Sequence, residues 1–105
     1  MFELVETAQF ISWFETLRDK SAKGRIIGRL ERLSFGQFGD VKPVGNSISE
    51  IRLDFGPGYR IYFQQRGSVV ILLLIGGDKD SQARDIQRAK RIADEFDLQF
   101  GAPMN

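Results

Sequence analysis

Two arginines on neighbouring predicted strands give the sequence its clearest chemical feature. Arg52 and Arg60 each fall on the polar side of an alternating apolar–polar run, which is typical of a half-buried β-strand. If the two strands form a hairpin, the arginines become cross-strand neighbours whose Cβ atoms lie about 5 Å apart. Two guanidinium groups repel each other at that distance, and a concave anion site would use both of them. The alternative is a pair of solvated surface arginines, bound to Glu50 or Asp54.

Composition narrows the chemistry that such a site could perform. The chain of 105 residues contains no histidine and no cysteine. It therefore lacks the usual general base, the commonest metal ligands and the Ser-His and Cys-His nucleophile pairs, and only Asp, Glu, Lys, Arg and Tyr remain. We predict neither a metal nor a cofactor. The net charge of +1 does not by itself indicate a nucleic-acid partner.

Three predicted strands position the arginines. Residues 50–55, 59–65 and 69–75 read as an antiparallel meander, with turns at residues 56–58 and 66–68. The third run is apolar without a break, which predicts an interior strand covered on both faces. Residues 76–80, which contain two glycines, are expected to leave the sheet sharply. Their spacing is not that of a Walker loop, so we do not expect nucleotide hydrolysis.

Helices and a short strand account for the rest of the chain. We predict a strand at residues 1–5, a helix capped by Thr7, a second helix from Ser21 to about Leu33, and a last helix capped by Asp80 or Ser81. The order β-α-α-β-β-β-α predicts one α+β domain over residues 1–105, with its helices packed on the sheet. No apolar run is long enough to span a membrane. The apolar stripes of the first two helices are expected to be Phe10, Ile11, Phe14 and Leu17, and then Ile26, Ile27, Leu30 and Leu33. One core is predicted from Phe10, Phe14, Ile27, Leu30, Leu53, Ile61, Phe63, Leu73 and Ile92.

The second helix carries a local excess of positive charge. Six basic residues in and before it face only Asp19 and Glu31, and they are Arg18, Lys20, Lys23, Arg25, Arg29 and Arg32. Such a stripe can bind the phosphates of RNA or DNA without reading their sequence. It can equally be a solvated helix face, which is the more common explanation of a charge run.

Four motifs carry a resemblance to a known group of proteins. They are E-I-R-L at Glu50–Leu53, G-P-G-Y-R-I-Y-F at Gly56–Phe63, L-L-L-I-G-G-D-K at Leu72–Lys79, and S-Q-x-x-D-I-x-x-A at Ser81–Ala89. With the order of elements, they resemble the RelE/ParE toxin superfamily, closest to its phage-derived, HigB-like branch of addiction module killer proteins. The resemblance covers nearly the whole chain.

The resemblance implies a RelE-like fold and the toxin of a type II toxin–antitoxin pair. Such a toxin is a cytoplasmic endoribonuclease that cleaves mRNA in the ribosome and is inhibited by a cognate antitoxin, here expected to be a helix-turn-helix DNA-binding protein. A ribose 2′-OH attacks the adjacent phosphate, so the enzyme mainly orients the backbone and stabilises negative charge, which needs no metal. Arg60 matches the family arginine, and Lys79 and Arg52 are the further catalytic candidates. The residues expected to contact RNA are Tyr59, Lys23, Arg25, Arg29 and Arg84. A tyrosine that RelE-like enzymes carry near the C-terminus has no counterpart in residues 81–100.

Two other functions fit the same sequence. A ParE-like toxin would share the fold and inhibit DNA gyrase through protein contacts, without a catalytic constellation. A non-catalytic module would use the basic helix only to hold RNA. A small helix-turn-helix gene immediately downstream would favour a toxin–antitoxin pair over the second of these.

Overall fold

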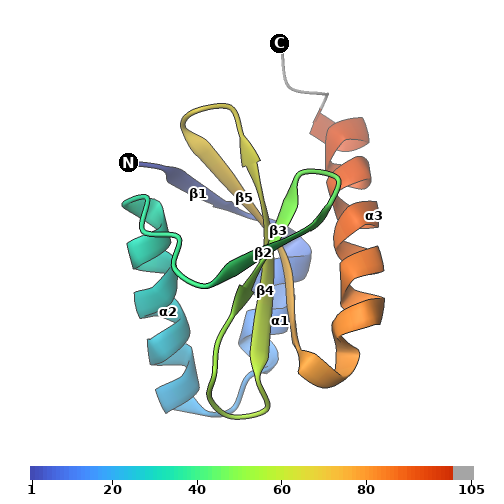
Figure 1. Ribbon diagram of the computed structural model, residues 1–105. Coiled ribbons are helices and arrows are strands. Elements are labelled where there is room, and N and C mark those ends of the chain that lie inside the picture. Colours follow the sequence, from blue (N-terminus) through green and yellow to red (C-terminus); the bar gives the residue numbers. More distant parts are fainter. Residues whose placement is uncertain (101–105) are drawn as a thin grey trace.

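The fold is a five-stranded sheet with helices on both of its faces (Figure 1). The structure is a computed structural model that describes residues 1–100, with side chains up to residue 98. Its elements are β1 (Glu3–Glu6), α1 (Ala8–Thr16), α2 (Lys20–Ser34), β2 (Val41–Gly45), β3 (Ile48–Arg52), β4 (Tyr59–Arg66), β5 (Val70–Asp78), a 3₁₀ turn η1 (Lys79–Ser81) and α3 (Gln82–Phe100). None of the helices in this described part combines the length and apolar character of a membrane span.

The strands lie in the order β1-β5-β4-β3-β2, with β1 parallel to β5 and all other pairs antiparallel. The predicted meander is thus confirmed as β3, β4 and β5, and β5 is an interior strand. The predicted order of elements was wrong by one strand, because residues 41–45 form a further strand, β2, that pairs with β3. Asn46 and Ser47, with φ of 57° and 60°, make the tight turn that allows this pairing.

Two apolar clusters, one on each face of the sheet, replace the single predicted core. The first joins α1 and α2 to the sheet through residues such as Phe10, Leu30, Ile61 and Phe63. The second joins α3 to the opposite face around Tyr62, Leu74 and Ile92. Figure 1 shows α2 and α3 on opposite sides of the sheet. The polar face of β3 and β4 is therefore not an open surface, since α3 covers much of it.

Helical spacing overestimated the apolar stripes at two positions. Ile27 is 55% exposed and Ile11 is 41% exposed, so both were wrongly placed in the core, whereas Ile26 and Leu33 are fully buried. Phe14 is half-buried and packs on the first cluster.

The glycines before α3 do not form a sharp exit from the sheet. Gly76 and Gly77 are residues of β5, opposite Ile61 and Arg60. A Cβ on Gly76 would lie 2.4 Å from the Trp13 ring, and one on Gly77 would lie 1.9 Å from Asp85 Oδ2. These glycines are needed because a helix packs closely on each face, which the sequence alone does not reveal.

The structure confirms one predicted helix cap and corrects another. The hydroxyl of Thr7 accepts a hydrogen bond from the N–H of Phe10 at 3.0 Å and donates to the carbonyl of Leu74 at 2.7 Å. Asp19, not Ser21, caps α2. Asp78 caps the preceding 3₁₀ turn η1 in a capping box with Ser81, and Asp80 and Ser81 lie within that turn, directly before α3.

Candidate functional site

Arg52 and Arg60 are direct cross-strand partners, as the alternation predicted. Both side chains are partly exposed at the end of the sheet, on the face that α3 covers. The positive charge of Arg52 is partly compensated, because its Nε donates a hydrogen bond to Glu50 Oε1 at 3.1 Å. The ion pair with Glu50 that was expected for surface arginines is therefore present, and it holds one of the two arginines in place.

Glu50 is the centre of a buried polar network. Its side chain is fully buried, and Oε2 accepts hydrogen bonds from the Tyr62 hydroxyl at 3.0 Å and from Gln82 Nε2 at 2.8 Å. Burial alone would raise the pKa of Glu50. The hydrogen bonds from Gln82, Arg52 and Tyr62, with the positive charge of Arg52, outweigh burial and hold this pKa below its ordinary value. Glu50 is therefore an ionised acceptor whose two oxygens are both occupied.

Tyr62 remains a donor in this network. Burial raises the pKa of Tyr62 far above its ordinary value, and the negative charge of Glu50, the hydrogen bond to it and the charge of Asp85 act in the same direction. The positive charge of Arg60 opposes them only weakly. Neither Tyr62 nor Glu50 is thus suited to exchange a proton with a ligand near neutral pH.

Arg60 is fixed at one end of its guanidinium group. Nη1 donates to the carbonyls of Gly58 at 3.0 Å and Tyr59 at 3.1 Å, and Nε is buried without an acceptor among the described residues. A Cβ on Gly58 would lie 3.3 Å from Lys79 Cδ and 3.5 Å from Arg60 Nη1, so the two cations flank this glycine. The structure thus brings together the three catalytic candidates Arg52, Arg60 and Lys79 at the ends of β3, β4 and β5.

The predicted RNA-contacting residues are more scattered. Tyr59 points to the opposite face of the sheet, where its ring packs on Phe55 and Trp13 with centroid separations of 5.6 and 6.3 Å. Arg25 stacks on the Phe55 ring, 3.8 Å from its centroid. These contacts place Tyr59 and Arg25 beside the β3–β4 loop rather than beside Arg60.

Arg29 does not belong to an exposed basic stripe. It is buried, and its guanidinium donates to the carbonyls of Gln37 and Phe38. Burial, followed by the charge of Arg32, lowers the pKa of Arg29, and Asp40 partly offsets them. Arg29 therefore holds the loop after α2, and the expectation of an exposed RNA contact was wrong about its position.

Lys23 and Arg84 complete the predicted set. Lys23 lies over the Phe14 ring, 5.3 Å from its centroid. Arg84 is 73% exposed and lies 3.8 Å from Asp85, which is buried and accepts a hydrogen bond from Ser81. The sequence does not reveal the burial of Glu50 or the parts played by Gln82 and Asp85, since no local pattern shows that α3 reaches β3.

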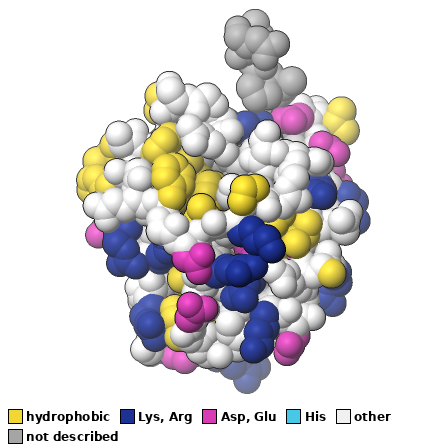
Figure 2. Space-filling model, in the orientation of Figure 1, with side chains coloured by type: hydrophobic (Ala, Val, Ile, Leu, Met, Phe, Trp, Pro, Cys, Tyr) yellow, Lys and Arg dark blue, Asp and Glu magenta, His cyan; other side chains and the backbone are white. Residues whose placement is uncertain are grey.

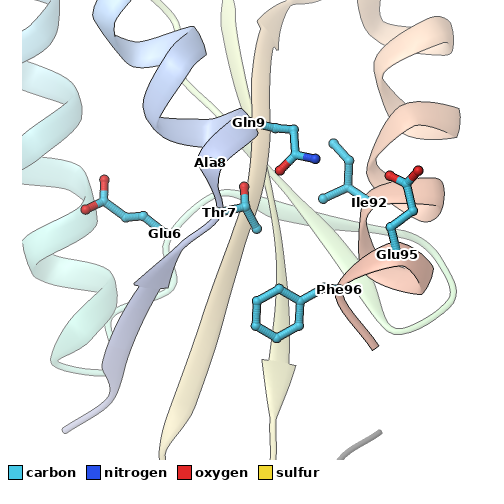
Figure 3. A pocket seen from close by; sticks show the side chains of 7 residues that line it. All are labelled: Glu6, Thr7, Ala8, Gln9, Ile92, Glu95 and Phe96. Carbon is cyan, nitrogen blue, oxygen red and sulfur yellow. The ribbon is translucent and has the colours of Figure 1, made fainter. Parts of the chain in front are cut away.

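The molecular surface carries its basic side chains in a broad band. Figure 2 shows Lys and Arg gathered over the lower half of the face between α2 and α3, with acidic groups among them. A pocket of about 210 Å³ lies elsewhere, between α3 and the junction of β1 with α1 (Figure 3). Glu6 and Glu95 line it, and no lysine or arginine does. It does not suit an anionic ligand.

Comparison with known proteins fixes the family and the fold. No family model matches the chain. A protein of Haemophilus influenzae (strain ATCC 51907 / DSM 11121 / KW20 / Rd), described as an uncharacterized protein, is 44% identical over 96 residues, which are 91% of this chain and 97% of that protein. The chain belongs to the same family as this Haemophilus protein.

A solved structure shows which fold the chain shares. The Escherichia coli toxin RelE, a mutant in the free state, superimposes with a TM-score of 0.63 at 20% sequence identity, over 87% of this chain and 97% of that chain. The α+β, RelE-like fold that the motifs implied is therefore confirmed. The HigB-like branch stays a prediction.

Proposed function

We propose that this chain is the toxin of a toxin–antitoxin pair and that it cleaves mRNA, in the ribosome, in the bacterial cytoplasm. The observation that supports this most directly is the pair Arg52 and Arg60 on a RelE-like sheet, next to Lys79. Three cations meet there, while the carboxylate of Glu50 is already occupied by three donors. Such a site favours an anionic ligand.

The proposed reaction needs charge stabilisation more than proton transfer. The ribose 2′-oxygen forms a bond to the adjacent phosphorus, and the bond from phosphorus to the 5′-oxygen breaks, which gives a 2′,3′-cyclic phosphate and a 5′-hydroxyl. The proton of the 2′-hydroxyl is released to solvent, and the leaving oxygen takes one up. Arg60, Arg52 and Lys79 would stabilise the negative charge that builds up on the phosphate oxygens. The Nε of Arg60 is buried without an acceptor among the described residues, so a phosphate oxygen would reach it only after the side chain moves.

Induction in cells tests the activity. The chain is expressed with parallel mapping of mRNA 5′ ends and of plasmid supercoiling, beside Arg60→Ala and the exposed control Arg91→Ala. We expect growth arrest and new 5′ ends within coding sequences for the wild type and Arg91→Ala only. Altered supercoiling without new 5′ ends would identify the chain as a gyrase inhibitor instead of a nuclease. If neither effect is observed, the chain is a non-toxic module.

The proposed partner is tested separately. We expect a cognate antitoxin, a helix-turn-helix DNA-binding protein encoded next to this gene, to form a stable complex and to restore growth when co-expressed. Co-purification through a tag on the toxin measures the complex. Rescue of growth without any complex would contradict this partner.

A further inference from the structure

A second group of arginines lies in a groove beside the Arg52–Arg60 pair. The groove has a volume of about 330 Å³ and runs between α2 and the end of β3 with its following loop. Its lining includes Arg25, Arg29, Arg32, Arg52, Asp54 and Phe55. Asp54 is the one carboxylate among the lining residues, so the groove is strongly electropositive.

The guanidinium groups of this groove differ in their freedom to bind a ligand. Arg29 is bound to the carbonyls of Gln37 and Phe38, and it contributes charge only. Arg25 has one face stacked on Phe55, which leaves its edge of N–H donors available. Arg32 is exposed, and no hydrogen bond or ion pair of its side chain is found within residues 1–100. Two arginines with free donors thus face one groove.

Contacts on both sides of the groove hold two of its arginines. Gly28 lies on α2 between Arg25 and Arg32 and also lines the groove. Phe55 holds Arg25 at the loop side, while the ion pair with Glu50 holds Arg52 at the sheet side. Arg25 and Arg52 are therefore held in place before any ligand arrives, which lowers the entropy cost of binding.

We infer that this groove is a second phosphodiester subsite, which binds the RNA backbone on one side of the bond to be cleaved. Arg52, at the end of β3, belongs both to the pair with Arg60 on the α3 side and to the lining of the groove on the α2 side (Figure 1), so a single strand over Arg60 would pass round this end of the sheet to enter the groove. This inference rests on the proposed nuclease function for the identity of the ligand as RNA. The groove sets how tightly the strand is held and not the rate of the chemical step.

Oligonucleotide binding tests the groove without cleavage. The probes are a dinucleotide and an octanucleotide of 2′-O-methyl RNA. Their blocked 2′-oxygens prevent the cleavage reaction. The variant Arg25→Gln/Arg32→Gln is compared with the control Arg18→Gln/Lys20→Gln, which removes the same charge from two exposed positions, one just before α2 and one at its first residue. Thermal unfolding confirms that each variant is folded, and Arg32→Gln alone serves if loss of the Arg25–Phe55 stack impairs folding.

The expected result depends on RNA length. Removal of each charge-assisted hydrogen bond to a phosphate should weaken octanucleotide binding roughly tenfold, and dinucleotide binding should change little. The slope of log K against log salt should fall by about 0.7 for each phosphate of the single strand that the variant no longer neutralises. The control should lower affinity for both probes equally and slightly. Octanucleotide binding by the double variant equal to that of the control would overturn the inference.

Two further outcomes separate this inference from the proposed function. If the groove variants lose octanucleotide binding in a protein that cleaves no mRNA, the subsite stands and the nuclease assignment falls. If the wild type cleaves mRNA and the groove variants bind RNA normally but lose the antitoxin, the groove is a protein-binding site. That result overturns the inference and leaves the proposed function intact.

Discussion

Arg52 lies directly opposite Arg60 in the β3–β4 ladder, and its Nε donates a hydrogen bond to the buried carboxylate of Glu50 at 3.1 Å. One fixed negative charge thus accompanies two positive ones on the same face of the sheet. Like charges at this spacing destabilise a sheet unless a counter-charge is present. The arrangement keeps both guanidinium groups in place while it leaves a positive excess at the surface.

Arg60→Ala should abolish most of the proposed cleavage activity. Loss of one preorganised donor to a transition-state oxyanion typically lowers the rate about a hundred- to a thousandfold. Arg60→Lys should be nearly as inactive, because an ammonium group cannot reproduce a planar donor fork. Cleavage of mRNA by the folded proteins measures this, with Arg91→Ala as the control. Near wild-type cleavage by Arg60→Lys would make Arg60 a mere source of charge.

Glu50→Gln should destabilise the protein by about 2–3 kcal/mol, the scale of hydrogen bonds to a charged group. The amide cannot accept all three donors, and its own N–H₂ would face one of them. Urea unfolding at neutral pH gives the value, with the exposed Glu31→Gln as the control. Equal stability of the two variants would mean that the network around Glu50 contributes nothing net.

The effect of Glu50→Gln should also depend on pH. The pKa of Glu50 is lower in the folded chain than its ordinary value of 4.5. Its ionisation therefore adds stability above the unfolded pKa, and that stability is lost as pH falls through the folded pKa. The difference in free energy of unfolding between wild type and variant should be constant near neutrality and shrink in acid. A difference that grows below pH ~4 would contradict the assigned direction.

Gly76→Ala should destabilise the fold by about 1–3 kcal/mol, the usual cost of overpacking. The new Cβ would lie 2.4 Å from the Trp13 ring, which must then move. Because the two sites touch, the cost should shrink in a Trp13→Ala background, as a double-mutant cycle would show. Gly24→Ala is the matched control, since nothing lies within 4 Å of its Cβ and the residue is inside α2. That control should be stabilising by about 0.5–1 kcal/mol.

Arg29→Met should lower stability without altering RNA contacts directly. The carbonyls of Gln37 and Phe38 would lose a charged donor, at a cost of about 1.5–3 kcal/mol. Hydrogen exchange in the loop at residues 35–40 should increase, which localises the effect. If Arg29→Met unfolds like the wild type but binds RNA more weakly, the original expectation of an RNA contact is restored.

Strand alternation predicted which residues share a face, and it did not predict what covers that face. It correctly separated Ile61 and Phe63 from Arg60 and Tyr62. It also placed Glu50 on a polar face, yet Glu50 is fully buried, because Gln82 and Tyr62 close over it from elements far along the chain.

Close packing between helices and sheet explains the other differences. The glycines at residues 76–77 resemble a turn in the sequence, and only the side chains of Trp13 and Asp85 explain why they lie in a strand. Arg29 has the same local sequence environment as its exposed neighbours and differs only by the loop that folds onto it. A single sequence records residue types along one chain, whereas these positions are decided by contacts between distant segments.

The parallel pairing of β1 with β5 has a consequence for how the chain acquires its structure. Glu3 pairs with Val70, so closing this pair joins segments 67 positions apart. Contacts of such separation carry a large loop-closure entropy and slow folding. A ribosome adds about 5–20 residues per second, so β1 emerges seconds before its partner strand exists. During synthesis, the apolar side chains of Leu4 and Val5 therefore stay unpaired until β5, the last strand of the sequence, has emerged and can join β1 to β4.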